Sequence, residues 1–562
     1  ISLGDRLDRK TSLGFQALLD VIGTVPGAPV KQAVLDAGIG TDFLCSFDGS
    51  VRQPYFSMVA KNANAEQKEC FVDTLEGAFR KLCAEGLDKK ALLATLNYYE
   101  FKFREADFGS YPKGLMYGLN MLDSWLYDDS KPFYYLELLD TYRELKELVQ
   151  TSYFEDMIRS LLLENTHKSI VVVRPVKGLT GQKDAKLAEE LKAKKEKMSP
   201  EEIRQIIEET KALKQYQEEP SPKEDLEKIP LLKRQDMKKE ATAYRNEEKK
   251  VDDTVLLYHD VFTNGIGYLR FQFDMREVPE RLFPYVGILK TLIGLVDTRE
   301  HSYSELYNEI NLHTGGIAPA VNTYTDAEDL QKYTATFDLK VKVLYENLPK
   351  AFALAKEILT ESVYQDKKRL FELLAEARSE KQAHMMSAGH TLAAGQALSC
   401  LSRSACIMEE VNGLPFYRRL EKLEGDFDGQ FRELSESLEE LTGYLFRPEN
   451  LLVDYTAEKK GLAGIEELIR EFKKSLFVTP VSGEGFVPQP VKKKQGLMSS
   501  AQIQYVCRAG NFTGKGLPYT GALRVLRVMM GYDYLWTQVR VKGGAYGCMC
   551  NFGKSGDSYF AV

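Results

Sequence analysis

The chain has 562 residues, of which 44% are hydrophobic and 28% are charged, and its formal net charge is −7 with a pI near 5.7. This length predicts roughly three to four domains of a soluble globular protein. The acidic balance excludes nucleic-acid binding, because phosphate contacts need clustered Lys and Arg. No run of residues approaches the ~18 apolar residues of a membrane span. Neither nucleic acid nor a membrane is therefore an expected partner.

The first block of the chain alternates helix and strand patterns. Residues 11–22 have helix-type apolar spacing, and a second short helix is expected near 30–37. Two strand-like runs, DFLCSF and PYFSMVA, flank a turn at Asp48-Gly49. Long amphipathic patterns then run from about 64 to 85 and from Asp88 onward. This order predicts helices packed beside a hairpin.

A stretch of different character follows, from about 183 to 250, dense in Lys and Glu. Ser199-Pro200 opens a strong helix pattern, because Ser caps the helix and Glu202 can close a capping box. With the charged helix expected before it, this predicts a helical hairpin, which is a hinge candidate between two halves. The alternating charges could also belong to a binding tail, although such runs usually form a solvated helix face.

The element order of the first block recurs from about residue 280. A helix pattern at 282–296 precedes a second helix at Ser302, with Glu305 in capping-box position, then Gly315-Gly316 and two strand patterns. The last helix of each block opens on Asp-Lys-Lys, at 88–90 and at 366–368. The repeat predicts two copies of one structural unit.

A third, partial copy begins near residue 521. Its helix pattern at 521–540 runs into Gly543-Gly544, a strand pattern at 545–552 and a turn at Ser555-Gly556. The final run, 558–562, is strand-like with nothing to pair it, and the chain starts at Ile1 without Met. We therefore expect a piece of a longer protein. The fold class is α+β, with repeated units of helices packed on one face of a mostly antiparallel sheet.

The histidines exclude one kind of catalytic site. The chain has six, at positions 167, 259, 301, 313, 384 and 390, and no two are four residues apart. A helical zinc site of the HExxH or HxxEH type needs that spacing, because it places both imidazoles on one face. His390 lies in a small-residue stretch, where close helix packing is expected instead of ligation. Spacing thus predicts no metal ligands in this chain.

Other catalytic signatures are missing as well. The sequence has no GxSxG elbow and no GxxxxGK[ST] phosphate loop. Its eight cysteines are too sparse for a disulfide scaffold, which favours a reducing compartment. Cys548 and Cys550 are two residues apart, and we interpret them as ordinary strand residues.

One segment, 536–552, is dense in residues that could contact a substrate. Arg540 falls at the end of a helix pattern, Gly543-Gly544 makes a turn, and Tyr546 is expected at the start of a strand. A permanent cation and a phenolic donor converging over such a turn could hold a peptide carbonyl as charge builds on it. Alternatively, Arg540 only complements the helix dipole and Tyr546 only packs in a sheet.

At these residues the sequence resembles the inverted-zincin peptidases related to insulysin and pitrilysin, specifically the presequence protease and falcilysin branch. The resemblance rests on RVKGGAYG at 540–547 and continues in four other segments along essentially the whole chain. These are HDVFTNGIGY near His259, TGGI at 314–317, SAGHTLAA near His390 and IQYVCRAGNF near Tyr505.

The resemblance implies a zinc metallopeptidase of four repeated α+β units, resembling those of mitochondrial processing peptidase, in two halves that close around a chamber. This chain would hold the second unit at 1–178, the hairpin linker at 179–250, the third unit at 251–478 and the start of the fourth at 479–562. The family's zinc motif belongs to the first unit. The resemblance therefore implies zinc in the parent protein, none bound by this chain, and a catalytic domain upstream as its partner.

The resemblance also assigns site residues. Arg540 and Tyr546 would contact the substrate carbonyl and the transition state, with Gly543 and Gly544 forming part of the substrate-binding surface. The expected substrates are short or unfolded peptides, and the chain alone would be inactive. The alternative is a catalytically inactive homologue that binds peptides or acts as a scaffold. The expected location is soluble and intracellular: cytoplasmic in a prokaryote, mitochondrial or plastid in a eukaryote.

Overall fold

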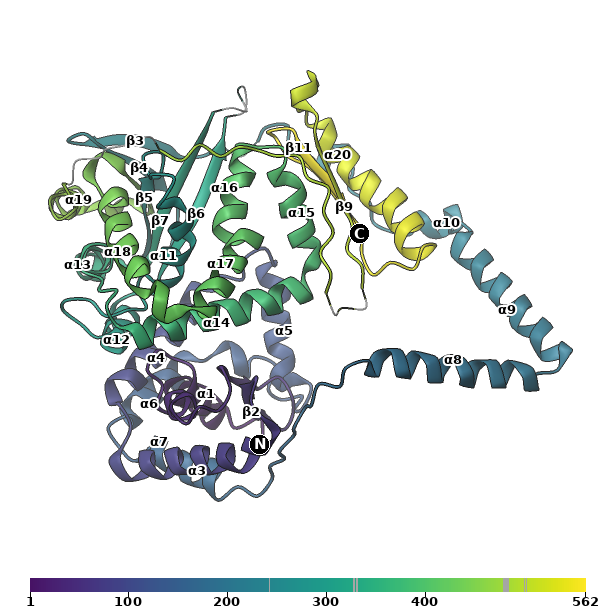
Figure 1. Ribbon diagram of the computed structural model, residues 1–562, viewed down its shortest axis with the longest axis horizontal. Helices are drawn as coiled ribbons and strands as arrows, with labels where there is room; N and C mark the ends of the chain where they lie inside the picture. Colours follow the sequence, from purple (N-terminus) through teal and green to yellow (C-terminus); the bar gives the residue numbers. More distant parts are fainter. Residues whose placement is uncertain (242, 327–328, 330–331, 479–484, 500, 502) are drawn as a thin grey trace.

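The computed structural model describes residues 1–562 except 242, 327–328, 330–331, 479–484, 500 and 502. Figure 1 shows two packed bodies, an extended helical segment and a smaller C-terminal sheet with its helix. We call these parts the N-terminal unit (1–165), the linker (166–245), the central unit (246–478) and the C-terminal unit (485–562). The expected boundary at 479 opens a stretch that lies outside the described residues.

The N-terminal unit packs its helices around a short hairpin. Its helices are α1 (Arg9–Gly23), α2 (Pro29–Asp36), α3 (Lys68–Glu85), α4 (Lys89–Glu105), α5 (Lys113–Trp125), α6 (Leu139–Leu148) and α7 (Tyr153–Met157), which continues as a π-helical turn, η3 (Ile158–Leu163). Strands β1 (Asp42–Asp48) and β2 (Tyr55–Lys61) pair antiparallel, which confirms the predicted hairpin. Phe15 of α1 packs against Phe47 and Phe56 of the hairpin at ring-centroid distances of 5.9 and 5.3 Å. Burial of these rings fixes α1 on the sheet.

The central unit is built on a six-stranded sheet with the order β3-β4-β8-β5-β7-β6. The strands are β3 (Asn246–Val251), β4 (Thr254–Asp260), β5 (Ile266–Asp274), β6 (Ile317–Thr325), β7 (Tyr333–Leu344) and β8 (Leu451–Ala457). Four pairs are antiparallel and one, β4 with β8, is parallel. The predicted strands after Gly315-Gly316 are thus confirmed as β6 and β7.

Helices of the central unit cover one face of this sheet. They are α11 (Val286–Leu292), α12 (Tyr303–His313), α13 (Leu348–Thr360), α14 (Lys367–Ser387), α15 (Gly389–Ser399), α16 (Arg403–Asn412), α17 (Leu414–Gly425), α18 (Phe427–Leu445) and α19 (Ile465–Lys474). Alternate residues of β5 are buried, and Phe271 packs its ring 5.1 Å from Phe352 of α13 and 4.5 Å from Phe472 of α19. A period of two in the strand and helices on one face define the α+β class, as the sequence predicts.

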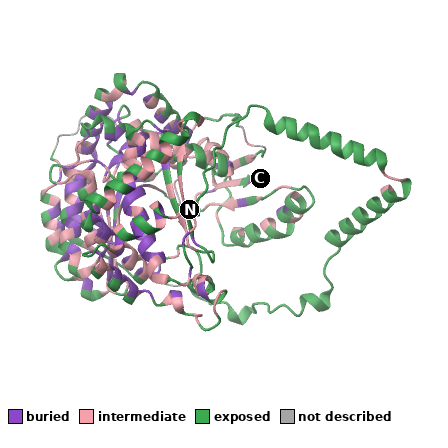
Figure 2. Cartoon of the chain, turned by 90° about the horizontal axis from the view of Figure 1, so that it is seen from below, coloured by how far each residue is buried: buried purple, intermediate pink, exposed green. Residues whose placement is uncertain are grey.

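The linker consists of exposed helices, α8 (Leu179–Lys197), α9 (Pro200–Glu218) and the short α10 (Lys223–Leu226). The predicted capping box at the start of α9 is confirmed, because the Glu202 N–H donates to Ser199 Oγ at 3.2 Å and the Ser199 N–H donates to Glu202 Oε2 at 2.8 Å. Both figures show α8 and α9 diverging from their junction, and Figure 2 colours almost all of their length as exposed. None of the helices in the described part of the chain combines the length and hydrophobicity that crossing a bilayer requires.

The N-terminal and central units meet along a seam where α4 lies against α12 and where α2 lies against α14. Ion pairs between described residues of the two units include Lys90 with Glu309 at 2.8 Å, Lys342 with Glu105 at 2.7 Å, Lys31 with Glu376 at 3.0 Å and Lys368 with Asp36 at 2.6 Å. Residues of α2 and α14 also line a cavity of about 490 Å³ at this seam. The two units are therefore joined by direct contacts as well as by the linker.

The C-terminal unit has a three-stranded sheet in the order β10-β11-β9 and one helix. Its elements are β9 (Cys507–Asn511), α20 (Ala522–Met529), β10 (Met549–Phe552) and β11 (Asp557–Ala561). The expectation that the last run has nothing to pair it is wrong, since β11 lies between β10 and β9 and pairs with both. In the register of β11 with β9, Asp557 lies opposite Asn511, and these two residues are 46 apart in the chain.

Candidate functional site

The turn that holds Arg540 follows directly from a long helix. Helix α20 continues as a π-helical stretch, η10 (Met530–Val541), and then stops at two glycines. The Gly544 N–H donates to the Arg540 carbonyl at 2.9 Å, and the Ala545 N–H donates to the Val539 carbonyl at 3.2 Å. These bonds satisfy carbonyl groups that the end of a helix leaves unpaired. Arg540 therefore lies at the helix end, as predicted.

Both glycines are required by the geometry of this turn. Gly544 has φ +75°, a left-handed conformation that side chains disfavour. A Cβ at Gly543 would lie 2.5 Å from the Val539 carbonyl oxygen, because the chain folds back closely on the helix end. The turn is thus compact and presents its outer surface to solvent.

Arg540 and Tyr546 both present exposed side chains at this turn. The Arg540 guanidinium lies over the Trp536 ring, 4.0 Å from its centroid, which is a cation–π contact. No carboxylate of the described residues forms an ion pair with Arg540. Tyr546 is 83% exposed. Its predicted position at the start of a strand is wrong, because β10 begins only at Met549.

Arg540 precedes the two glycines in the sequence, and Tyr546 follows them. Within the described part of the chain, no hydrogen bond or ring contact joins Arg540 to Tyr546, so their convergence stays a prediction. The linker reaches the same turn, since Lys542 Nζ lies 3.5 Å from Glu218 Oε1 at the end of α9. The end of α9 and the turn are thus neighbours.

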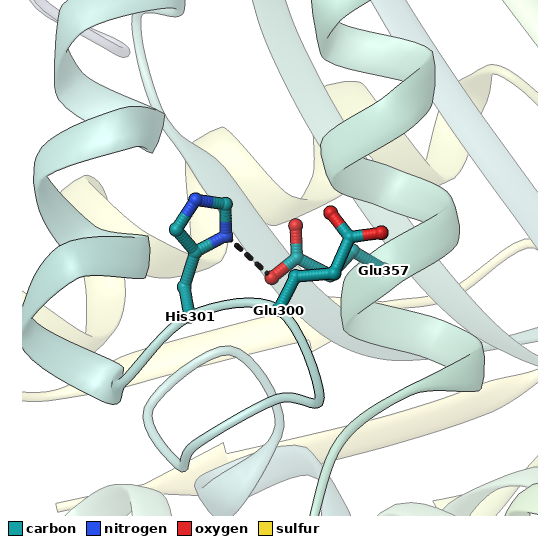
Figure 3. A group of neighbouring side chains, drawn as sticks. All are labelled: Glu300, His301 and Glu357. Atoms are coloured by element: carbon teal, nitrogen blue, oxygen red, sulfur yellow. Dashed lines mark hydrogen bonds and ion pairs between the residues drawn. The ribbon is translucent and has the colours of Figure 1, made fainter.

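The histidines have different neighbours in the fold. His390 stands at the start of α15, and its ring lies 5.9 Å from that of Tyr505 in the C-terminal unit. His259 Nε2 lies 3.4 Å from Asp454 on the central sheet. The described residues contain one group of three side chains that could ligate a metal, namely Glu300, His301 and Glu357 (Figure 3).

No short spacing in the sequence marks this last group, because Glu357 is distant in the chain from the other two members. His301 and Glu357 are 56 residues apart in the chain, and helix α12 with two strands separates them. The one local signal was the adjacent pair Glu300-His301 at the start of a capped helix. Such pairs are common, and only the fold shows which distant carboxylate joins them.

Two family models match this chain. The model for the domain associated with subfamily C of the M16 peptidases matches residues 173–423, and the "PreP C-terminal domain" matches residues 494–561. The second match includes β9, η10, the Arg540 turn and both remaining strands.

Curated relatives match over nearly the whole chain. Protein HypA of Clostridium perfringens is 34% identical over 557 residues, which is 99% of this chain and 57% of the relative. Presequence protease 1, chloroplastic/mitochondrial, of Arabidopsis thaliana is 27% identical over 97% of this chain and 51% of the relative. The mitochondrial presequence protease of Saccharomyces cerevisiae is 25% identical over 94% and 54%. The chain thus spans about half the length of the curated relatives it matches.

Solved structures give more distant matches. The periplasmic protease PqqL of Escherichia coli has a TM-score of 0.38 at 10% identity, covering 100% of this chain and 59% of that one. A peptidase M16 inactive domain of Pseudomonas fluorescens has a TM-score of 0.36 at 13% identity, covering 57% and 73%. The assignment does not depend on them. On the family models and relatives, this chain belongs to the presequence-protease branch, subfamily C, of the M16 peptidases.

Proposed function

We propose that this chain is the non-catalytic portion of a zinc-dependent oligopeptidase that degrades short or unfolded peptides inside a closed chamber. The observation that carries the proposal is the turn at 540–547. Two side chains able to donate hydrogen bonds, Arg540 and Tyr546, are exposed there on either side of a glycine pair. Membership of the presequence-protease family supports the same reading.

In this proposal Arg540 and Tyr546 bind the carbonyl oxygen of the peptide bond that is cleaved. The guanidinium is a permanent cation and the phenol is a neutral donor, so both interactions strengthen as negative charge develops on that oxygen. Gly543 and Gly544 carry no side chains, which lets a peptide backbone approach the turn closely.

The residues of this chain do not fit the family's catalytic zinc. The sequence has no pair of histidines four residues apart, and the one candidate ligand group in the described structure includes a single histidine. We therefore place the zinc, which would polarise the substrate carbonyl and activate water, in another part of the parent protein. This chain's partner would be that catalytic domain.

Turnover of an unfolded peptide by the full-length protein tests the proposal. Arg540→Ala and Tyr546→Phe should each lower kcat by roughly 10²-fold with intact thermal unfolding, because each removes a donor used in the transition state. The matched controls are Arg524→Ala and Tyr534→Phe, exposed residues of the same helical segment, which should leave kcat unchanged.

Two results would contradict the proposal. Unchanged turnover in both variants returns Arg540 and Tyr546 to the packing interpretation. A full-length protein that binds unfolded peptides without cleaving them would instead identify an inactive homologue. The isolated chain should show no peptidase activity.

A further inference from the structure

Three potential metal ligands meet where the loop before α12 touches α13. Glu300 and His301 come from the loop and Glu357 from the helix, and Figure 3 shows the three side chains turned toward one another. Their ligand atoms all lie within 4.8 Å of one another. One imidazole nitrogen and two carboxylate oxygens form a donor set that suits first-row divalent metals.

The charge of this group is not balanced by its neighbours. Glu357 is only 4% exposed, and a buried carboxylate is costly unless a cation or hydrogen bonds compensate it. The ammonium of the adjacent Lys356 pairs at 2.7 Å with another carboxylate, Glu361. Glu357 accepts hydrogen bonds from Thr298 and His301. Among the described residues, neither Glu300 nor Glu357 forms an ion pair with Lys or Arg.

The loop that carries the ligands is held rigidly. The Thr298 N–H donates to the His301 carbonyl at 2.8 Å, and the Tyr303 N–H donates to Asp297 Oδ1 at 2.7 Å. The Thr298 hydroxyl also donates to Glu357. The first two bonds shape the loop and the third joins it to α13, so His301 and Glu357 are positioned before any ion binds.

We propose that Glu300, His301 and Glu357 bind one divalent cation of the Mn²⁺ type. His301 Nδ1 and Glu357 Oε1 are 2.9 Å apart. These two atoms are joined by a hydrogen bond, which an ion bound to both would replace. The mixed imidazole and carboxylate donors suit an ion that also keeps bound water. The ion would join the start of α12 to α13.

An ordinary His–Glu pair has the same contact between His301 Nδ1 and Glu357. A divalent ion would replace that hydrogen bond and would also engage Glu300. Binding of the ion and participation of Glu300 therefore distinguish the metal site from an ordinary His–Glu pair.

Titration of the 562-residue chain with Mn²⁺, followed by electron paramagnetic resonance, tests the site. Mn²⁺ is used because the chain has eight free cysteines, whose thiolates bind Zn²⁺ elsewhere. We expect one saturable Mn²⁺ per chain. Glu300→Gln and His301→Gln should each weaken binding at least about tenfold, and a given concentration of Mn²⁺ should raise the Tm of the unsubstituted chain more than that of either variant.

The control variant is His259→Gln, which removes a histidine that pairs with Asp454 on the central sheet. Mn²⁺ affinity should not change in this variant. Glu300 is exposed, so its substitution leaves the core intact and decides the question even if changes at the buried Glu357 impair folding. The proposal is overturned if the chain shows no saturable Mn²⁺ binding. It is also overturned if Glu300→Gln and His301→Gln bind Mn²⁺ as tightly as the unsubstituted chain does.

Discussion

Gly315 of the central unit lies directly against the ring of Phe101 in the N-terminal unit. A Cβ at position 315 would stand 2.0 Å from Phe101 Cε1, far inside van der Waals contact. Phe101 is buried in α4, and Gly315 donates its N–H to the Lys342 carbonyl at 2.7 Å. The TGGI motif thus contains a glycine whose missing side chain makes room for another unit.

Gly315→Ala should therefore open the seam between the two units. Neither the ring, buried in α4, nor the strand beside residue 315 can move freely, so we expect a loss of roughly 1–3 kcal/mol in the free energy of unfolding. Denaturant unfolding followed by circular dichroism measures it. Gly77→Ala in α3, where nothing lies within 4 Å of a new Cβ, is the matched control and should be neutral or slightly stabilising.

A double substitution separates this clash from backbone strain. Phe101→Leu should recover part of the stability in the Gly315→Ala background while costing stability alone, which gives a non-additive cycle. Additive effects of the two changes would show that Gly315 is needed for its conformation and not for its contact with Phe101.

Glu309 makes the same seam sensitive to acid. Burial alone would raise its pKa, but the ammonium groups of Lys350 and Lys90 outweigh burial and lower the pKa to about 2. Lys90 belongs to the N-terminal unit and Lys350 to the central unit, with Nζ–carboxylate distances of 2.8 and 2.7 Å. One carboxylate therefore bridges both units.

The lowered pKa predicts a pH window. The folded state holds Glu309 ionised below its unfolded pKa of about 4.5, so its stabilisation is present above pH 4.5 and is lost as the pH falls toward 2. Glu309→Gln should cost about 1–3 kcal/mol at pH 7 and much less at pH 3. Chemical unfolding at both pH values tests this, with Glu346→Gln, an exposed carboxylate, as a control that shows no such difference.

Asp20 predicts the opposite pH dependence. Burial raises its pKa above the ordinary 3.8, although the Tyr99 hydroxyl, which donates to it, partly opposes this. The unfolded chain then loses the proton first, so this contribution to the free energy of unfolding falls as the pH rises from about 4 through the folded pKa. Asp20→Asn keeps an acceptor for Tyr99 without the charge.

We expect Asp20→Asn to be more favourable for the free energy of unfolding at pH 7 than at pH 3. Thermal unfolding across that range measures the difference. Asp73→Asn, an exposed position on α3, should follow the pH profile of the unsubstituted chain. A pH-independent loss in Asp20→Asn would mean that the charged carboxylate is itself needed in the core.

Local signals in the sequence predict most helices and strands, but they do not predict which residues distant in the chain become partners. Ser302 with Glu305 marked a helix start that the structure confirms, because a capping box depends on neighbours in sequence. The Asn511 side chain that binds Asp557 of the last strand comes from 46 residues away, and the approach of His301 to Glu357 spans 56. Such pairings are set by packing of whole units, which no short pattern encodes.

The same limit applies to the candidate site. Arg540 was predicted at a helix end because apolar spacing stops there, and the structure agrees. Tyr546 lies in a strand only if the chain begins to pair with β11 soon after the two glycines. Hydrogen bonding between β10 and β11 decides where that strand begins. Apolar alternation alone placed the strand too early.

The C-terminal unit, which carries the Arg540 turn, contacts helix α15 of the central unit. Gly389, the first residue of α15, faces Tyr505, and a Cβ there would lie 2.4 Å from the Tyr505 ring. Helix α15 also packs against β9 and β11. The C-terminal unit therefore docks on the central unit through a close approach at this glycine.

Gly389→Ala should loosen that docking while leaving both larger cores folded. We expect amide exchange in β9 and β11 to speed up at least about tenfold, because a contact worth roughly 1–2 kcal/mol is lost where the unit opens locally. Hydrogen–deuterium exchange reports it, and Gly118→Ala on α5, with open space around a new Cβ, should leave exchange unchanged. If docking aims Arg540 at the substrate, turnover of the full-length Gly389→Ala protein should fall together with protection of β9. Faster exchange with unaltered turnover would show that the turn keeps its orientation without α15.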